Sequence, residues 1–257
     1  EHHDGNMVHV VVAPCSPFSV STELMIESAE LARKYGLRMH THLCETIDEQ
    51  ELCLERFGKQ PVMQLVDWGW AGDDVWLAHG IHLTTDEISL LGEAGTGIAH
   101  CPSSNARIAA GLCPVVDFRE NHVPVGLGVD GAASNEVGGL FGEMRQALYT
   151  ARIREERADA LMPKDVLDMA TVGGAKCLGR ENLGAINIGN PADLVVWPGN
   201  DLGGIVDPIT ALILGSDRRA KHVYVAGEQR VKDGELLGVN VRTAHQKLAE
   251  RSKRLWN

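Results

Sequence analysis

The chain has 257 residues, 44% hydrophobic and 23% charged, which is typical of a globular protein long enough to bury a sizeable core. Its formal net charge of −11 disfavours nucleic acid as a partner, because phosphate binding requires a concentrated basic patch. No apolar run reaches the roughly 18 residues of a membrane span, and the six cysteines form no CxxC pair, so we expect reduced thiols and a cytoplasmic location.

Short apolar runs alternate with amphipathic stretches in the first two thirds of the chain. The expected strands cover residues 8–13, 37–43, 75–78, 96–100 and 123–129. The expected helices cover residues 21–35, with Ser21 as N-cap, and then 48–57, 62–68, 85–93, 114–121, 140–155 and 163–177. Strands of about five residues separated by helices indicate parallel βαβ units.

Each expected strand carries a polar residue at its carboxyl end, where (β/α)8 barrels build their active sites. These residues are Cys15, His42, His79, His100 and Asp130. A doubly wound sheet would instead show a glycine-rich loop after its first strand, and the Pro-Cys-Ser-Pro segment at 14–17 is not such a loop. We therefore predict an α/β fold that is the C-terminal part of a TIM-type barrel, with five of its eight strands.

The pattern changes near Leu183. Turn residues from Gly184 to Asp193 lead into a short strand, and residues 221–226 and 229–232 predict a hairpin around Gly227. A last helix is expected from about Thr243. The predicted division is a barrel portion at 1–182, part of a small β-sandwich domain at 183–240 and a terminal helix at 241–257.

A histidine, a glutamate and an aspartate at strand ends are the groups that metal-assisted hydrolysis needs, and His42, Glu45 and Asp130 fit this pattern. His40 lies two residues before His42 and on the same side of the strand, so it is either half of an HxH metal pair or a residue of a lower barrel layer. His100 is either a support for the site or a packed, hydrogen-bonded histidine.

The ordered set of motifs resembles the amidohydrolase superfamily, in the branch of cytosine and guanine deaminases and triazine chlorohydrolases. The motifs are His42-x-x-Glu45, Leu-Ala-His-Gly at 77–80, His-Cys-Pro-x-Ser-Asn at 100–105, Gly-Val-Asp-Gly at 128–131 and Gly-Asn-Pro-Ala-Asp-Leu-Val at 189–195. The segment at 13–20 is similar to that of the 8-oxoguanine deaminase group.

The resemblance implies a mononuclear site for zinc, with iron as the alternative, ligated by His42 and Asp130. Glu45 would shuttle protons without binding the metal, and His79 would hydrogen-bond the attacking hydroxide or the substrate carbonyl. Asp130 would then serve in both the metal site and the catalytic set. The implied reaction is hydrolytic deamination of a purine-like heterocycle, with 8-oxoguanine or isoguanine as the substrate.

A polar rim is expected beside these groups. Cys15 follows one strand, and Ser104 and Asn105 follow another, so we predict that they bind the hydrogen-bonding edge of a planar small molecule. Two alternatives stay open: hydrolytic loss of chloride or an alkylamine from a triazine, and a non-catalytic barrel relative. Homo-oligomer formation is left open.

One part of the family pattern is missing. The family takes two metal ligands from an HxH segment on its first barrel strand, and none precedes residue 7. We expect residues 1–257 to be the C-terminal portion of a longer protein. Because two protein ligands are one fewer than a catalytic zinc normally has, this chain by itself should bind metal weakly.

Overall fold

The computed structural model describes residues 7–199, 204, 206–215 and 219–255. The chain forms two compact units, Glu1–Ala185 and Ile186–Asn257. The first and last residues of the predicted domains, 1–6 and 256–257, lie outside the described residues. The three-part division predicted from the sequence stays a prediction.

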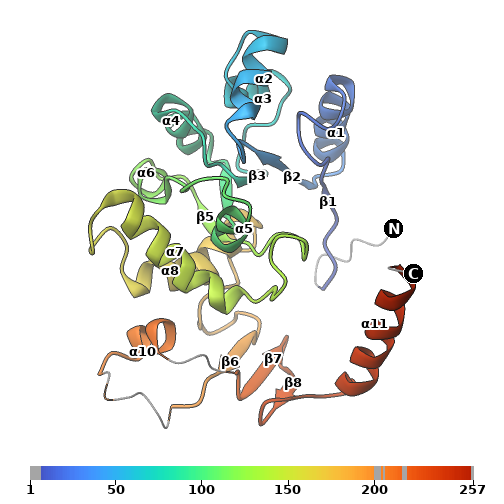
Figure 1. Ribbon diagram of the computed structural model, residues 1–257, viewed down its shortest axis with the longest axis vertical. Coiled ribbons are helices and arrows are strands. Elements are labelled where there is room, and N and C mark those ends of the chain that lie inside the picture. Colours follow the sequence, from blue (N-terminus) through green and yellow to red (C-terminus); the bar gives the residue numbers. More distant parts are fainter. Residues whose placement is uncertain (1–6, 200–203, 205, 216–218, 256–257) are drawn as a thin grey trace. The chain divides into compact units, whose positions relative to one another are not determined.

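The first unit is built on one parallel sheet of five strands, which confirms the α/β class. The strands follow one another in space in the same order as in the sequence. They are β1 (Val11–Val12), β2 (Arg38–Leu43), β3 (Val75–His79), β4 (Gly97–His100) and β5 (Val125–Leu127). Helices lie in an arc along the outer side of this sheet (Figure 1).

The helices of this unit follow the predicted order, with two differences. They are α1 (Thr22–Lys34), α2 (Asp48–Phe57), α3 (Pro61–Asp67), α4 (Thr85–Ala94), α5 (Pro102–Arg107), α6 (Val115–Glu120), α7 (Leu140–Glu155), α8 (Pro163–Asp168), the π-helical turn η1 (Met169–Gly173) and α9 (Gly174–Cys177). Ser21 caps α1 as predicted, because its side chain accepts the Leu24 N–H at 3.2 Å. Helix α5 was not predicted because six largely polar residues show no apolar period.

The second difference is the π-helical turn, which lies within the predicted helix 163–177 and crosses β5 closely. A Cβ at Gly173 would lie 2.1 Å from the Val125 carbonyl oxygen, and one at Gly126 would lie 2.8 Å from Gly174 Cα. Glycine is therefore required on both sides of this crossing. The close approach fixes residues 169–177 against the sheet. A sequence period of 3.6 residues predicts a continuous α-helix here and does not reveal the π-helical turn.

Strand β2 shows how the sheet positions the candidate site. Met39, Thr41 and Leu43 are buried, whereas His40 and His42 between them are only half-buried. Because alternate residues of a strand point to opposite faces, the two histidines share the face away from the buried set.

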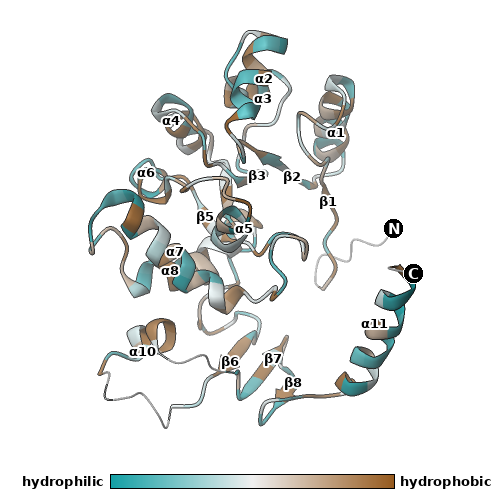
Figure 2. Cartoon of the chain, viewed as in Figure 1, coloured by the Kyte–Doolittle hydropathy of each residue, from teal (hydrophilic) through white to brown (hydrophobic). Residues whose placement is uncertain are grey.

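The second unit contains an antiparallel sheet of four strands and two helices. The strands are β6 (Leu194–Val196), β7 (His222–Val225), β8 (Glu228–Lys232) and β9 (Glu235–Leu236), and the helices are α10 (Pro208–Leu214) and α11 (Val241–Leu255). The hairpin predicted around Gly227 and the terminal helix are both present, while β9 and α10 were not predicted. Helix α11 has no buried residue, and Figure 2 shows it mostly in the colour of hydrophilic residues.

All six cysteines are free, as expected from their irregular spacing, and five of them are buried. Burial raises the pKa of Cys53 and of Cys177 to about 11, so these thiols stay protonated near neutral pH and serve as small packing groups. The cytoplasmic location stays a prediction. Within the described residues, no helix is long and apolar enough to cross a membrane.

Candidate metal centre

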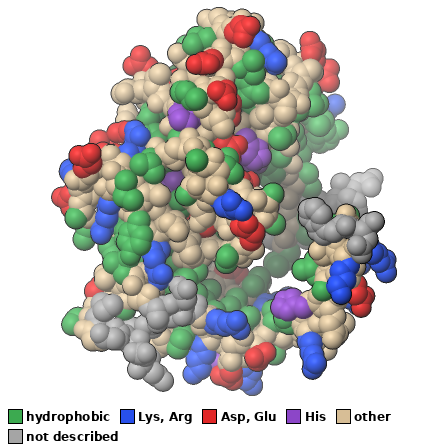
Figure 3. Space-filling view, viewed as in Figure 1, with side chains coloured by type: hydrophobic (Ala, Val, Ile, Leu, Met, Phe, Trp, Pro, Cys, Tyr) green, Lys and Arg blue, Asp and Glu red, His purple; other side chains and the backbone are tan. Residues whose placement is uncertain are grey.

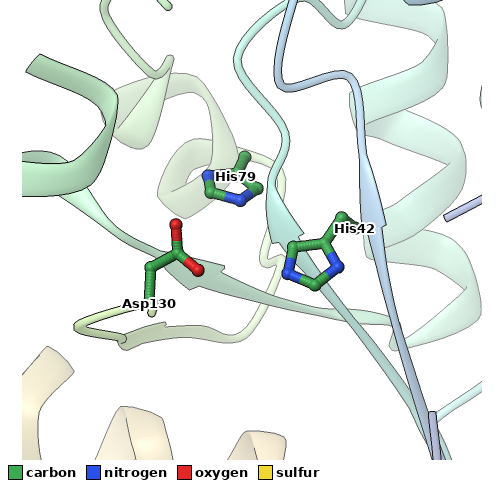
Figure 4. Close-up of side chains that lie close together, drawn as sticks. All are labelled: His42, His79 and Asp130. Atoms are coloured by element: carbon green, nitrogen blue, oxygen red, sulfur yellow. The ribbon is translucent and has the colours of Figure 1, made fainter. Parts of the chain in front are cut away.

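Three side chains from three strand ends converge at the carboxyl edge of the parallel sheet. Possible ligand atoms of His42, His79 and Asp130 all lie within 4.8 Å of one another. Figure 4 shows His42 on β2, His79 at the end of β3 and Asp130 on the loop beyond β5, directed toward a common point. Segments nearly 90 residues apart in sequence are therefore brought to one place by the order of the strands.

The backbone at two of these positions is left-handed. His79 has φ +73° and Asp130 has φ +61°, values that side-chain-bearing residues rarely adopt. In the register of β2 and β3, His79 pairs with Leu43, which points away from the face of His42. The left-handed turn redirects the His79 side chain, and the rings of His42 and His79 stack with their centroids 5.4 Å apart.

The His42 ring is oriented by the loop that follows β1. Its Nδ1 lies 2.6 Å from the Cys15 carbonyl oxygen, which also accepts the His42 backbone N–H at 3.0 Å. Because a carbonyl can only accept, Nδ1 must carry the proton, and Nε2 then keeps its lone pair. A backbone oxygen on one ring nitrogen and a metal on the other is the usual arrangement for histidine ligands. The Cys15 side chain itself is exposed.

His79 is fully buried and held by Asn105. Its Nδ1 lies 2.8 Å from Asn105 Oδ1, and its Nε2 has no hydrogen-bond partner but lies 3.5 Å from Glu45 Oε1. With Nδ1 donating to the amide oxygen, Nε2 accepts on a neutral ring and donates on a protonated one. The unpartnered Nε2 of His79 thus points toward the Glu45 carboxylate.

Asp130 is surrounded by donors. Ser104 Oγ lies 2.6 Å and Ser134 Oγ 3.0 Å from Oδ2, while the Gly131 N–H donates to Oδ1 at 2.7 Å. Burial by itself would raise the pKa of Asp130, but these hydrogen bonds outweigh it, and the pKa is lowered from its ordinary value. The two serine oxygens are also 2.8 Å apart. With one hydroxyl hydrogen each, the two serines can satisfy at most two of these three contacts at a time.

His40 and His100 lie near the site but outside the group of three. His40 stacks on Trp76 at 5.2 Å, its Nδ1 donates to the Trp76 carbonyl at 3.2 Å, and burial lowers its pKa to about 4. His40 is thus held by Trp76, and its role stays a prediction. His100 is 1% exposed, neither ring nitrogen has a partner, and burial lowers its pKa to about 3.

The donor set suits a divalent transition metal. Imidazole nitrogen and carboxylate oxygen, which His42 and Asp130 offer, are ligands that zinc accepts, and the His79 imidazole lies beside them. Ligand atoms around a tetrahedral zinc are about 3.4 Å apart, since each bond is about 2.1 Å. The possible ligand atoms of the three residues lie up to 4.8 Å apart, which is about 1.4 Å more than that spacing. Figure 3 shows histidine and acidic side chains together on one face of the first unit.

The structure gives Ser104 and Asn105 contacts within the protein. Both are buried, and they bond Asp130 and His79 respectively. Their predicted role in substrate binding stays a prediction. Sequence reasoning also missed Ser134, which contacts Asp130. The only signal was a serine four residues after Asp130, and that is not distinctive without the fold.

Parallel strands ending in imidazole and carboxylate groups define an α/β protein with a candidate metal centre. Residues 1–230 match the family model described as amidohydrolase family. The chain is 48% identical over 240 residues to 8-oxoguanine deaminase from Pseudomonas aeruginosa, an alignment that covers 93% of this chain and 53% of that protein. It is 36% identical to isoxanthopterin deaminase of an unknown prokaryotic organism, covering 94% of this chain and 54% of that protein.

Two solved structures with bound zinc are also similar to this chain. An atrazine chlorohydrolase from Arthrobacter aurescens complexed with zinc superposes with a TM-score of 0.92 at 32% identity, covering 97% of this chain and 57% of that one. An adenosine deaminase from Xanthomonas campestris with bound zinc gives a TM-score of 0.91 at 30% identity, covering 94% and 56%. The chain belongs to the amidohydrolase family. It spans about half the length of the relatives that it matches.

Proposed function

We propose that the protein carrying this chain is a metal-dependent aminohydrolase that deaminates a purine-like heterocycle, with 8-oxoguanine as the first candidate substrate. The observation that carries the proposal is the convergence of His42, His79 and Asp130, with Glu45 3.5 Å from the free nitrogen of His79. The similarity to deaminases of fused-ring heterocycles supports the substrate class. We further propose that the five parallel strands are part of a (β/α)8 barrel, as the superpositions suggest.

His42 and Asp130 would hold one divalent ion, with zinc preferred because two superposed structures contain it. When bound, such an ion lowers the pKa of a water molecule to about 7 and so provides a nucleophile at neutral pH. Ser104 and Ser134, which contact Asp130 Oδ2, would favour the ionised carboxylate that a metal needs as a ligand. The Cys15 carbonyl fixes the proton on His42 Nδ1, which leaves Nε2 free to bind.

Glu45 would move the protons of the reaction. Water adds to the ring carbon that bears the amino group, and the C–N bond to that group then breaks, giving a ring carbonyl and ammonia. Glu45 takes one proton from the water and gives it to the neighbouring ring nitrogen, and it then takes the proton of the added hydroxyl and gives it to the departing amine. Both protons of the water are thus used, and none is gained or lost. His79, held by Asn105, would hydrogen-bond the hydroxide or the substrate carbonyl. The exposed Cys15 side chain would line the substrate rim.

The proposal is tested with the purified protein and a panel of 8-oxoguanine, isoguanine, other purines, pyrimidines and chlorotriazines. Release of ammonia and of chloride is measured together with the metal content. We expect ammonia from 8-oxoguanine or a close purine. Chloride release without deamination of any purine would instead establish a triazine hydrolase, and turnover of no compound by metal-loaded protein would favour a non-catalytic relative.

A further inference from the structure

Glu49 lies in the first turn of α2 and fastens the loop that follows β2. Its carboxylate accepts the backbone N–H groups of Cys44 at 2.7 Å, Glu45 at 3.1 Å and Thr46 at 3.4 Å. The N-cap of α2, Ile47, makes no side-chain cap bond. The Glu49 carboxylate therefore bonds the backbone of the segment that carries Glu45, and only its contact with Thr46 lies next to the start of its own helix.

The Cys44 peptide also joins this loop to the one that follows β3. Its carbonyl accepts the N–H groups of Ile81 at 2.9 Å and His82 at 3.2 Å, and the Leu43 carbonyl accepts the Gly80 N–H at 3.0 Å. Cys44 itself is left-handed, with φ +51°. A side-chain-bearing residue keeps this conformation only where its surroundings hold it.

A chain of bonds thus runs from Glu49 to the catalytic candidates on both loops. The Cys44 N–H is held by Glu49, the Cys44 carbonyl holds residues 81 and 82, and His79 lies two residues before Ile81. Burial raises the pKa of Glu49, so its ionised form depends on the three N–H donors that face it. Glu49 is therefore held in place by three backbone hydrogen bonds and is not a solvated surface carboxylate.

We propose that Glu49 is a positioning residue that sets the approach of Glu45 to His79 by fixing the Cys44 peptide between the two loops. The inference deepens the proposed function and rests on it for the role of Glu45. Glu49 touches neither the candidate metal ligands nor the free edge of His79 in any contact of the described residues. Its effect reaches the reaction only through the two loops.

The first test is Glu49→Gln, which keeps the size of the side chain but replaces one acceptor oxygen with an NH2 group facing a backbone N–H. We expect kcat to fall about 10- to 100-fold, because small misplacements of catalytic groups have effects of this size. KM should stay within about twofold of wild type, because substrate binding is not altered. Metal content should be unchanged, since Glu49 contacts no candidate ligand.

The second readout is amide hydrogen exchange, which needs no activity. Glu49→Gln should speed exchange at residues 44–46 and also at 81 and 82, although Glu49 does not touch the latter two. The matched control is Glu87→Gln. Glu87 is a buried first-turn glutamate of α4 that accepts the N–H groups of Val62 at 2.9 Å and Thr84 at 3.0 Å. This control should lose stability and exchange faster at residues 62 and 84, while keeping kcat and the exchange rates of residues 44–46, 81 and 82.

Unchanged exchange at 81 and 82 in Glu49→Gln would overturn the inference, as would a kcat equal to that of wild type. If Glu49→Gln does not fold, Glu49→Asp carries the test, because it keeps the charge but retracts the carboxylate. It should show faster exchange at 44–46 and at 81 and 82, and unchanged exchange there would again refute the link. If the wild-type protein turns over no substrate, the proposed function is contradicted. The exchange rates at 81 and 82 then still test whether Glu49 links the two loops.

Discussion

Ser104→Ala tests whether the serine hydroxyls hold Asp130 for the metal. The hydroxyl of Ser104 lies 2.6 Å from Asp130 Oδ2, and the side chain is fully buried, so water cannot easily replace it. A hydrogen bond to a charged group contributes about 1.5–3 kcal/mol, which corresponds to a factor of roughly 10 to 150. Ser134 lies 3.0 Å from the same oxygen and keeps one donor in place. We therefore expect an effect at the lower end of this range, with the metal Kd of Ser104→Ala raised about tenfold.

The metal Kd is measured by titration against a competing chelator. Ser103→Ala is the matched control, because Ser103 is on the same helix and contributes its backbone N–H to Glu143 at 3.0 Å, a bond that the substitution retains. Its Kd should equal that of wild type. The double variant Ser104→Ala with Ser134→Ala should weaken binding about 100-fold, since it removes both donors. A metal Kd within about twofold of wild type in the double variant would refute the reasoning.

Three further outcomes are expected. Glu45→Gln should retain the metal and lose about 100-fold or more in kcat, and near-normal turnover would return Glu45 to a structural role. His42→Ala and Asp130→Ala should each abolish stoichiometric metal, whereas His79→Ala should keep the ion and lose turnover; loss of the ion, measured by elemental analysis, would make His79 a third ligand. The pKa of His100 is about 3 in the folded protein and about 6.5 in the unfolded chain. Between pH 6.5 and pH 3 the unfolded chain therefore binds a proton that the folded protein does not. The free energy of unfolding should fall as the pH drops through this range. His100→Leu should flatten that fall, by up to about 1.4 kcal/mol per pH unit in urea unfolding, and an unchanged slope would contradict the assignment.

Much of the first unit follows from local sequence signals. Short apolar runs and amphipathic stretches of period 3.6 are properties of neighbouring residues, so β2, β3, α1 and α7 were predicted to within a residue or two. The polar residue at each strand end was also visible, and the parallel order of strands brings such residues together whatever the details. For this reason the sequence could place His42, His79 and Asp130 at one edge of the sheet, where the structure brings them together. The choice of His42 and Asp130 as metal ligands came from the family resemblance and stays a prediction.

Contacts between distant segments decided the rest. The left-handed backbone of His79 turns its ring onto the face of His42, against the alternation that the strand alone predicts. The hydroxyl of Ser104, predicted to lie on a substrate rim, is buried against Asp130. Glu49 holds a loop through backbone N–H groups that any sequence would supply. Sequence determines which chemical groups reach the edge of the sheet, because that depends on local pattern. Only the folded chain determines which of them face each other, because hydrogen bonds between loops depend on distances through space.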